Sequence, residues 1–296
     1  MWRLSIIITK AVIPAAGRGT RLLPATKETP KEMLPIFSEN IQRELTVKPI
    51  LQVIFEQMYD FGVREYCFIV GKGKSSLIDH FTIDKTELAY LNEKEKQSLF
   101  LELSNIQHKL TSSSLVFINQ PEPRGFGDAV LKARPYITDT FLVQAGDTLI
   151  LSKNNQHMNR LWNVHKKYDN AATIMVQEVD DPRQFGIVLG NEEEKGVISV
   201  DKVIEKSESP PSKIAITALY LFSPSIFNAL ELTSEGSGGE VQLTDGIQKM
   251  IDSGLNVMAV ELKKNEYWLD IGNPESYWSA LNRSRNNILN SKTIIK

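Results

Sequence analysis

The sequence predicts an α/β protein with an open, mixed but mainly parallel sheet, and three observations lead to this prediction. Short apolar runs of strand length alternate with segments of helical periodicity along most of the chain. The 296 residues, 42% of them hydrophobic, can bury one large core, and no linker is long enough to separate two domains. Glycine-rich and polar segments directly follow strand-like runs, where ligands bind in such sheets. We therefore expect one Rossmann-like domain over 1–296, with helices on both faces of the sheet.

The first half contains the clearest alternation. Apolar periods predict strands over 10–16, 65–70, 114–119 and 140–147. A helix is expected over 49–62, because its apolar residues recur at helical spacing and Gly62 supplies a stop signal. A second helix is expected over 125–137, and the charged segment 83–109 has the pattern of a helical insertion between two strands. The apolar residues before Lys10 are taken as part of the first strand, not as a signal peptide.

The second half continues the pattern with more strands in succession. Strands are expected over 171–179, 197–206 and 214–222, and helices over 159–169 and 238–254. The change of pattern divides the chain into two halves, about 1–150 and about 151–296.

Composition excludes several classes of function. The 34 basic and 36 acidic residues leave a net charge of −2, which gives no electrostatic reason to expect a nucleic acid or a membrane as partner. The single cysteine, Cys67, lies in an apolar run and is expected to be buried and inert, so neither a disulfide framework nor a cysteine metal site is possible. No run is long enough for a membrane helix, and we expect a cytoplasmic protein. The four histidines lie in helical or polar segments and are expected to be solvated.

The segment "AAGRGTRLLPATKETPKEMLP" (15–35) follows the first strand and resembles a phosphate-binding loop. It does not fit the dinucleotide fingerprint, because Leu22 stands where the third glycine is required and the prolines disfavour a helix. Nor does "VGKGKSS" form a P-loop, since Phe68 occupies the position of its first glycine. Small residues leave the backbone N–H groups of the first loop accessible to phosphate oxygens, with Arg21 and Lys31 supplying charge.

Taken whole, this segment resembles the signature of the sugar-phosphate nucleotidylyltransferases, and in particular the bacterial-type branch that joins UTP to glucose 1-phosphate. Further likenesses follow in order in "NQPEPRGFGDAV", in Gly146–Asp147, in "FGIV", in "IEK", in "GGEVQLTDGI" and in "WLDIGNPESY". The likeness spans Lys10 to about Tyr277. It implies UDP-glucose formation, with pyrophosphate released, by a nucleotide-binding half, about 1–150, and a sugar-phosphate-binding half, about 151–296, and it suggests a homo-oligomer.

The resemblance also assigns roles to individual residues. It implies catalytic roles for Arg21, Lys31 and Asp147, and Mg²⁺ binding by Asp147 and Asp270. The implied nucleotide-binding residues are Ala15, Ala16, Gly17, Gly19, Thr20, Gln120, Gly125 and Gly127, and the implied sugar-phosphate-binding residues are Gly186, Glu205 and Lys206. Gln120 can both donate to and accept from the edge of uracil. Because neighbouring residues of a strand point to opposite faces, Glu205 and Lys206 can meet one ligand only if the strand ends or twists there.

Departures from the family pattern leave alternatives open. Ser207 replaces a proline after "EK", Lys213 replaces an asparagine, and Ala218 replaces a glycine where the sugar approaches. These changes leave open a thymidylyltransferase, transfer to another hexose 1-phosphate, or a regulator that binds nucleotide sugars without turnover. About ten extra residues at 38–47 lengthen the loop after "PKEMLP", and no function is assigned to them.

Overall fold

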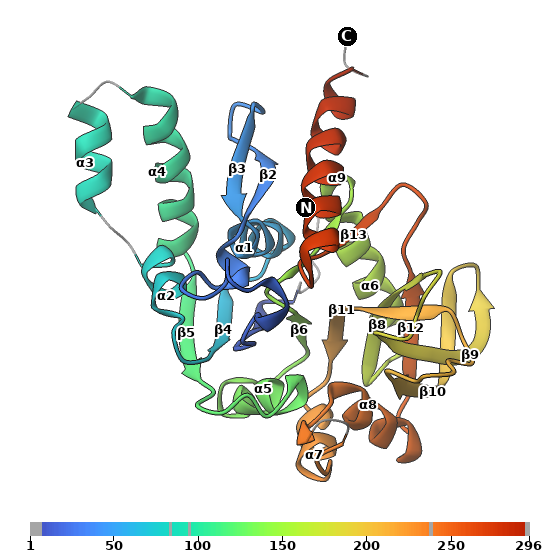
Figure 1. The fold of residues 1–296 in the computed structure, drawn as a ribbon. Helices are drawn as coiled ribbons and strands as arrows, with labels where there is room; N and C mark the ends of the chain where they lie inside the picture. The colour runs from blue at the N-terminus through green and yellow to red at the C-terminus, as the bar shows by residue number, and fades with distance from the viewer. Residues whose placement is uncertain (1–7, 83–84, 94–95, 237–238, 294–296) are drawn as a thin grey trace, which may run out of the picture.

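A nine-stranded mixed sheet runs through both halves of the chain in the computed structural model, which describes residues 8–82, 85–93, 96–236 and 239–293 (Figure 1). The strand order is β5-β4-β1-β6-β11-β8-β12-β10-β9. These strands are β1 (Lys10–Ala15), β4 (Glu65–Val70), β5 (Ser114–Asn119), β6 (Phe141–Gln144), β8 (Ala172–Glu178), β9 (Gly186–Glu194), β10 (Val197–Glu205), β11 (Ile214–Phe222) and β12 (Val257–Glu261). The predicted fold class is confirmed.

Pairing changes from one end of the sheet to the other. β5, β4, β1 and β6 are parallel, whereas β11 runs antiparallel to both β6 and β8. Beyond it β12 is parallel to β8, β10 is antiparallel to β12, and β9 is antiparallel to β10. The glycine loop and Asp147 thus follow parallel strands, while Glu205 ends an antiparallel one.

Two hydrophobic cores cover the two faces of the sheet because successive strand residues alternate in direction. In β1, Ile13 belongs to one core and Val12 to the other; in β4, Phe68 and Ile69 divide in the same way. Helices α1 (Ile50–Phe61), α4 (Gln97–Thr111) and α6 (Gln156–Lys167) cover the first face. Helices α5 (Phe126–Lys132), α7 (Ser225–Glu231) and α8 (Leu243–Asp252) cover the second (Figure 1).

The insertion at 83–109 and the extra residues at 38–47 form ordered elements that contact each other. The insertion contains α3 (Lys85–Glu93) and most of α4, after the short α2 (Ser75–His80). Residues 38–47 complete a hairpin of β2 (Pro35–Glu39) and β3 (Leu45–Pro49). Lys48 Nζ lies 2.7 Å from Glu102 of α4, and Ser98 of α4 donates to Gln42. The hairpin lies between α4 and the long α9 (Pro274–Thr293), as Figure 1 shows.

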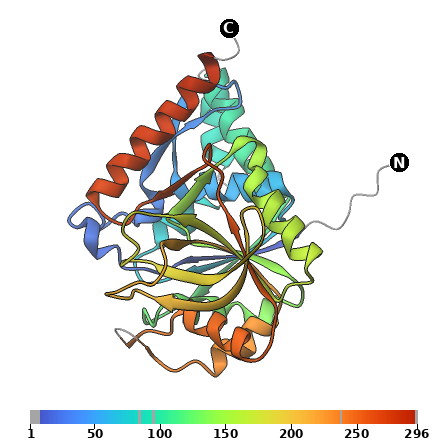
Figure 2. The same cartoon turned by 90° about the vertical axis from the view of Figure 1, so that its right-hand side faces the viewer.

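A two-stranded sheet next to the main one positions two aspartates. β7 (Thr148–Leu151) pairs antiparallel with β13 (Tyr267–Asp270), so that Asp270 lies opposite Thr148 and beside Asp147. α9 follows β13 directly and lies along one side of the molecule (Figure 2). Our sequence-based prediction omitted both of these strands, the hairpin and α9.

Two expectations about single residues have different outcomes. Cys67 is buried, and burial raises the pKa of its thiol to about 11, as expected for an inert cysteine. The prediction of solvated histidines is wrong for His157 and His165, which are buried on α6 and hydrogen-bonded to Ser152 and Thr173. Burial lowers the pKa of both imidazoles to about 4. Among the described residues no helix has the length and apolar character needed to cross a membrane.

Candidate functional site

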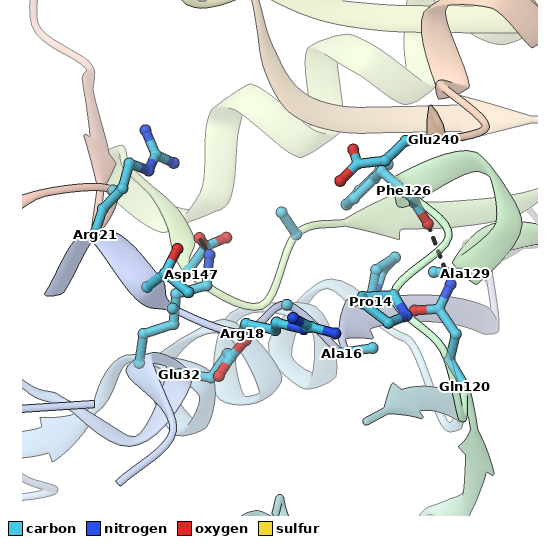
Figure 3. Close-up of a pocket in the computed structure, with 18 residues that line it drawn as sticks. Pro14, Ala16, Arg18, Arg21, Glu32, Gln120, Phe126, Ala129, Asp147 and Glu240 are labelled. Carbon is cyan, nitrogen blue, oxygen red and sulfur yellow. Dashed lines mark hydrogen bonds and ion pairs between the residues drawn. The ribbon is translucent and has the colours of Figure 1, made fainter. Parts of the chain in front are cut away.

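A cavity of about 560 Å³ opens at the carboxyl ends of β1 and β6, the edge predicted from the position of Asp147 (Figure 3). Its lining includes most of the residues expected at the nucleotide and at the reacting phosphate, namely Ala16, Gly17, Gly19, Thr20, Arg21, Lys31, Gln120, Gly125 and Asp147. Ala15 lies outside it in the core, because strand alternation turns Pro14 and Ala16 to the cavity instead.

The glycine loop follows β1 without an α-helix. Gly19 has a left-handed φ of 66°, and two short 3₁₀ turns, Thr20–Leu22 and Lys31–Met33, replace the helix of a dinucleotide fold. The hydroxyl of Thr26 donates to the carbonyl of Gly19 at 2.7 Å and ties the proline-rich stretch to the loop. Lys31 returns to the loop in this way, and its side chain passes next to Gly17.

Two cations and two carboxylates lie at one end of the cavity, where it meets a neighbouring cavity. The ammonium of Lys31 forms an ion pair with Asp147 Oδ2. Burial lowers the pKa of Lys31, but Asp147 and Glu32 raise it, and the net shift is upward. Burial and the Asp147 carboxylate raise the pKa of Asp270 to about 6, against the opposing effects of Lys31 and Arg21. The cluster is therefore a place where two nearby carboxylates repel each other and a cation would bind favourably.

Glu32 and Lys74 form a buried ion pair behind this cluster. Lys74 Nζ donates to Glu32 Oε2 at 2.6 Å, and the side chains of both residues are less than a tenth exposed. Burial raises the pKa of Glu32, against Lys74, which lowers it. Because Glu32 follows Lys31 on the same 3₁₀ turn, this pair anchors the turn that carries Lys31. Lys74 belongs to the segment "VGKGKSS", whose sequence is similar to a P-loop. In the structure Lys74 is the N-cap residue of α2.

The far end of the cavity contains Gln120, Gly125 and Phe126 (Figure 3). Gln120 Nε2 donates to Asp128 Oδ2 at 2.7 Å and to the carbonyl of Gly125 at 3.2 Å. Both amide hydrogens are thus committed, which corrects the expectation that this amide both donates to and accepts from a base. Gly127 lies outside the cavity. A Cβ on Gly125 or Gly127 would lie less than 3 Å from the carbonyl oxygen of Val241. The absence of a side chain at both positions therefore lets the segment before α8 pack closely against them.

The predicted sugar residues cluster at the end of β10. Lys206 has a left-handed φ of 40°, which ends the strand and brings its ammonium to 3.1 Å from Glu205 Oε1. Glu205 and Lys206 therefore lie together, as the geometric condition requires. Gly186 pairs with Glu205 across β9 and β10, and a Cβ there would lie 2.6 Å from Thr244 Cγ2.

A second cavity of about 320 Å³ adjoins the first and shares Arg21 with it. Its lining includes Phe185, Ala218, Trp268 and Asp270. Gly186, Glu205 and Lys206 are absent from this lining, although Gly186 directly follows Phe185. Asp147 and Asp270 thus face neighbouring cavities, with Arg21 at the boundary.

The carboxylates fit a divalent cation that also binds substrate phosphates. In the described part of the chain no group of three or more His, Cys, Asp or Glu side chains could hold a metal alone. Asp147 and Asp270 can supply two oxygen ligands, and Mg²⁺ usually takes the rest of its octahedral shell from phosphates and water.

Residues that the sequence-based prediction missed are recognised by their contacts and positions in the structure. They are Glu32 and Lys74 behind Lys31, Asp128 behind Gln120, Thr244 behind Glu205, and Glu240 in the cavity wall. The "GGEVQLTD" motif contained two of them, but it gave no contact partner.

Comparison with known proteins identifies a family. The model of the nucleotidyl transferase family matches residues 10–287. A curated UTP–glucose-1-phosphate uridylyltransferase from Streptococcus pyogenes is 39% identical over 274 residues, which cover 90% of this chain and 84% of the relative.

Solved structures agree. A UDP-glucose pyrophosphorylase complexed with UDP-glucose is 27% identical with a TM-score of 0.80, over 95% of this chain and 99% of that one. A UTP-bound UGPase from Acinetobacter baumannii is 26% identical with a TM-score of 0.79, over 98% and 99%.

Proposed function

This chain belongs to the nucleotidyl transferase family, and on that premise we propose that it transfers the uridylyl group of UTP to glucose 1-phosphate, giving UDP-glucose and pyrophosphate. The observation that carries the proposal is the cluster of Arg21, Lys31, Asp147 and Asp270 at the junction of two cavities. The first cavity is assigned to the nucleotide and the second to the sugar, with Glu205 and Lys206 beyond its lining, next to Gly186, which follows the lining residue Phe185. A phosphate of each substrate can then reach the same charged cluster.

The reaction needs charge neutralisation and alignment more than proton transfer. The attacking phosphate oxygen of glucose 1-phosphate is already anionic at neutral pH, so no general base is required. We assign the triphosphate to the backbone of Ala16–Gly19, to Arg21 and to Lys31, whose ammonium is held at the cluster by Asp147. Glu205 is assigned to the sugar hydroxyls and Lys206 to the sugar phosphate, supported by their 3.1 Å contact at the end of β10.

We also propose that Asp147 and Asp270 hold Mg²⁺, which would neutralise charge on the phosphates when bound. Burial and the nearby Asp147 carboxylate raise the pKa of Asp270, and a bound cation would relieve both effects, which supports this assignment. Lys31 binds Oδ2 of Asp147, so the other carboxylate oxygen remains for the metal.

UTP is proposed as the nucleotide in preference to dTTP. The named relatives are uridylyltransferases, and no contact in the described residues favours the thymidylyltransferase alternative. Of the substitutions that suggested a catalytically inactive regulator, Lys213 is exposed and Ser207 lies outside both cavities. Ala218 lines the second cavity together with Arg21 and Asp270, where its methyl group bears on the choice of sugar.

A matrix of nucleotides and sugars tests the proposal. Purified protein with Mg²⁺ is incubated with UTP, dTTP or CTP and with glucose, galactose or N-acetylglucosamine 1-phosphate, and both pyrophosphate and the nucleotide sugar are measured. We expect the highest kcat/KM for UTP with glucose 1-phosphate. Absence of any nucleotide sugar in all combinations would contradict the function, and a higher kcat/KM with another pair would reassign it.

We further propose that the chain forms a homo-oligomer. Val47 on β3 and Trp278 on α9 are more than half exposed, and such apolar surface favours protein contacts. Within the described residues β3 pairs with no strand other than β2. Light scattering coupled to gel filtration should give a mass above that of one 33.4 kDa chain; a monomer at all concentrations would refute the proposal.

A further inference from the structure

Asp128 holds the amide of Gln120 in one orientation. Both groups that receive hydrogen bonds from Gln120 Nε2, the Asp128 carboxylate and the Gly125 carbonyl, are acceptors. Turning the amide over would place its oxygen against these two acceptors, which is repulsive. The amide oxygen must therefore point the other way, into the cavity, as Figure 3 shows.

The surroundings keep this arrangement rigid. Gln120 is 4% exposed and Asp128 is 5% exposed, so neither side chain has room to rotate freely. Asp128 lies in the first turn of α5, where the helix dipole favours a carboxylate. One turn later, Lys132 Nζ lies 3.6 Å from the second oxygen of Asp128. No hydrogen bond to the oxygen of Gln120 is found in the described part of the chain.

We propose that Asp128 is a positioning residue that makes Gln120 a hydrogen-bond acceptor only, and thereby selects pyrimidines that carry a proton on N3. This inference rests on the proposed function, which places the base beside Gln120. Uracil and thymine have an N3–H that can donate to the amide oxygen. Cytosine has a lone pair at N3, which would face that oxygen and be repelled, so CTP is disfavoured.

The variant Asp128→Asn tests the role of the carboxylate. The new amide can present its N–H₂ group to Gln120, so only the Gly125 carbonyl still opposes the flipped orientation, and that orientation becomes accessible. We expect the ratio of kcat/KM for UTP to that for CTP to fall about fivefold, roughly the difference between a charged and a neutral hydrogen bond. KM for glucose 1-phosphate should not change. If Asp128 had a purely structural role, the substitution would lower kcat/KM for UTP and for CTP by the same factor. An unchanged ratio of the two kcat/KM values in a folded variant would therefore overturn the inference.

The matched control is Lys132→Met, which removes the ion pair with Asp128 but leaves its bond to Gln120. Its UTP-to-CTP ratio should equal that of the wild type, and a fall like that of Asp128→Asn would contradict the role given to Gln120.

A second measurement needs no variant. The wild-type protein is assayed with 3-methyluridine triphosphate, which lacks the N3 proton, and kcat/KM should be at least about tenfold below that for UTP. Equal turnover of the two nucleotides would refute the inference even if Asp128→Asn does not fold. Wild-type turnover of UTP itself tests the proposed function separately.

Discussion

The nucleotide end and the sugar end of the site both contain residues with a left-handed backbone conformation, but the types of residue at these positions differ. At the nucleotide end the left-handed positions are glycines, Gly19 with φ 66° and Gly125 with φ 104°. At the sugar end they carry side chains, Lys206 with φ 40° and Ala218 with φ 55°. A residue with a Cβ in this region costs about 1–2 kcal/mol relative to its usual conformation. The nucleotide end is therefore built without strain, whereas the sugar end depends on surrounding contacts.

Those contacts are side-chain hydrogen bonds from neighbouring elements. Glu205 is held between Lys206 on one oxygen and Thr244 of α8 on the other. Gln248, one turn after Thr244, accepts from the backbone of Val203 and fixes the same strand. The glycine loop binds phosphate whatever sugar is attached, so the contacts at the sugar end can vary without loss of phosphate binding. Backbone strain at the sugar end is therefore compatible with a role of this end in the choice of sugar. The predictions below test this contrast, from the largest effect to the smallest.

Asp147→Asn should affect both ends at once, because Asp147 lies between them. Asparagine keeps the shape but loses the charge that pairs with Lys31 and that would bind the metal. We expect kcat to fall by at least about a hundredfold with both substrates saturating. Steady-state assays give kcat, and circular dichroism checks the fold. The matched control, Asp139→Asn, changes an exposed aspartate before the opposite end of β6 and should be normal. Near-normal activity of Asp147→Asn would remove it from catalysis.

Thr244→Val should act at the sugar end alone. The hydroxyl of Thr244 donates to Glu205 Oε2 at 2.8 Å, and valine has the same shape without that donor. Loss of a hydrogen bond to a charged group predicts an increase in KM for glucose 1-phosphate of about tenfold, with KM for UTP unchanged. Thr244→Ser keeps the donor and should stay within about threefold of wild type. If valine and serine behave alike, the hydroxyl does not position Glu205.

Much of the nucleotide end was predictable from the sequence, and at the sugar end the sequence predicted that the strand must end or twist at Glu205 and Lys206. The apolar pattern predicts the strands, and the glycines, prolines and Asp147 come directly after them in the sequence. Their place in the fold can therefore be read from neighbouring residues alone. The partners Thr244 and Lys74 are recognisable only once distant segments meet, whereas Asp128 lies eight residues after Gln120 in the same motif and was overlooked because the motif does not show the contact. His157 and His165 were misplaced for a related reason: their polar neighbours on α6 indicated solvent, while packing on the sheet buried them. The hairpin at 35–49 was missed because its flanking prolines resemble a loop.

Ala218→Gly should relieve strain at the sugar end. Glycine removes the cost of a left-handed alanine, about 1–2 kcal/mol, and loses about 0.4–1 kcal/mol through the unfolded chain, so the free energy of unfolding should rise by roughly 0.5 kcal/mol. Denaturant titration measures it. Ala218 lines the second cavity, so loss of its methyl group should also raise kcat/KM for bulkier hexose 1-phosphates relative to glucose 1-phosphate.

The control for this variant is Ala215→Gly on the same strand, which has no left-handed φ to relieve and should lose stability. Equal loss of stability in both variants would mean that the φ of Ala218 carries no strain.

Thr26→Val should have the smallest effect, and this is the sharpest test of the contrast. Thr26 donates to the carbonyl of Gly19, but that carbonyl also accepts from the backbone of Leu22 at 3.0 Å, and the turn needs only a glycine. Loss of the hydroxyl should therefore lower kcat/KM for UTP by only about twofold, the lower end of the value of one neutral hydrogen bond. Thr29→Val, an exposed change in the same loop, is the control and should be silent. A loss larger than that of Thr244→Val would mean that a side chain holds the glycine loop too, and the two ends would no longer differ in how they are built.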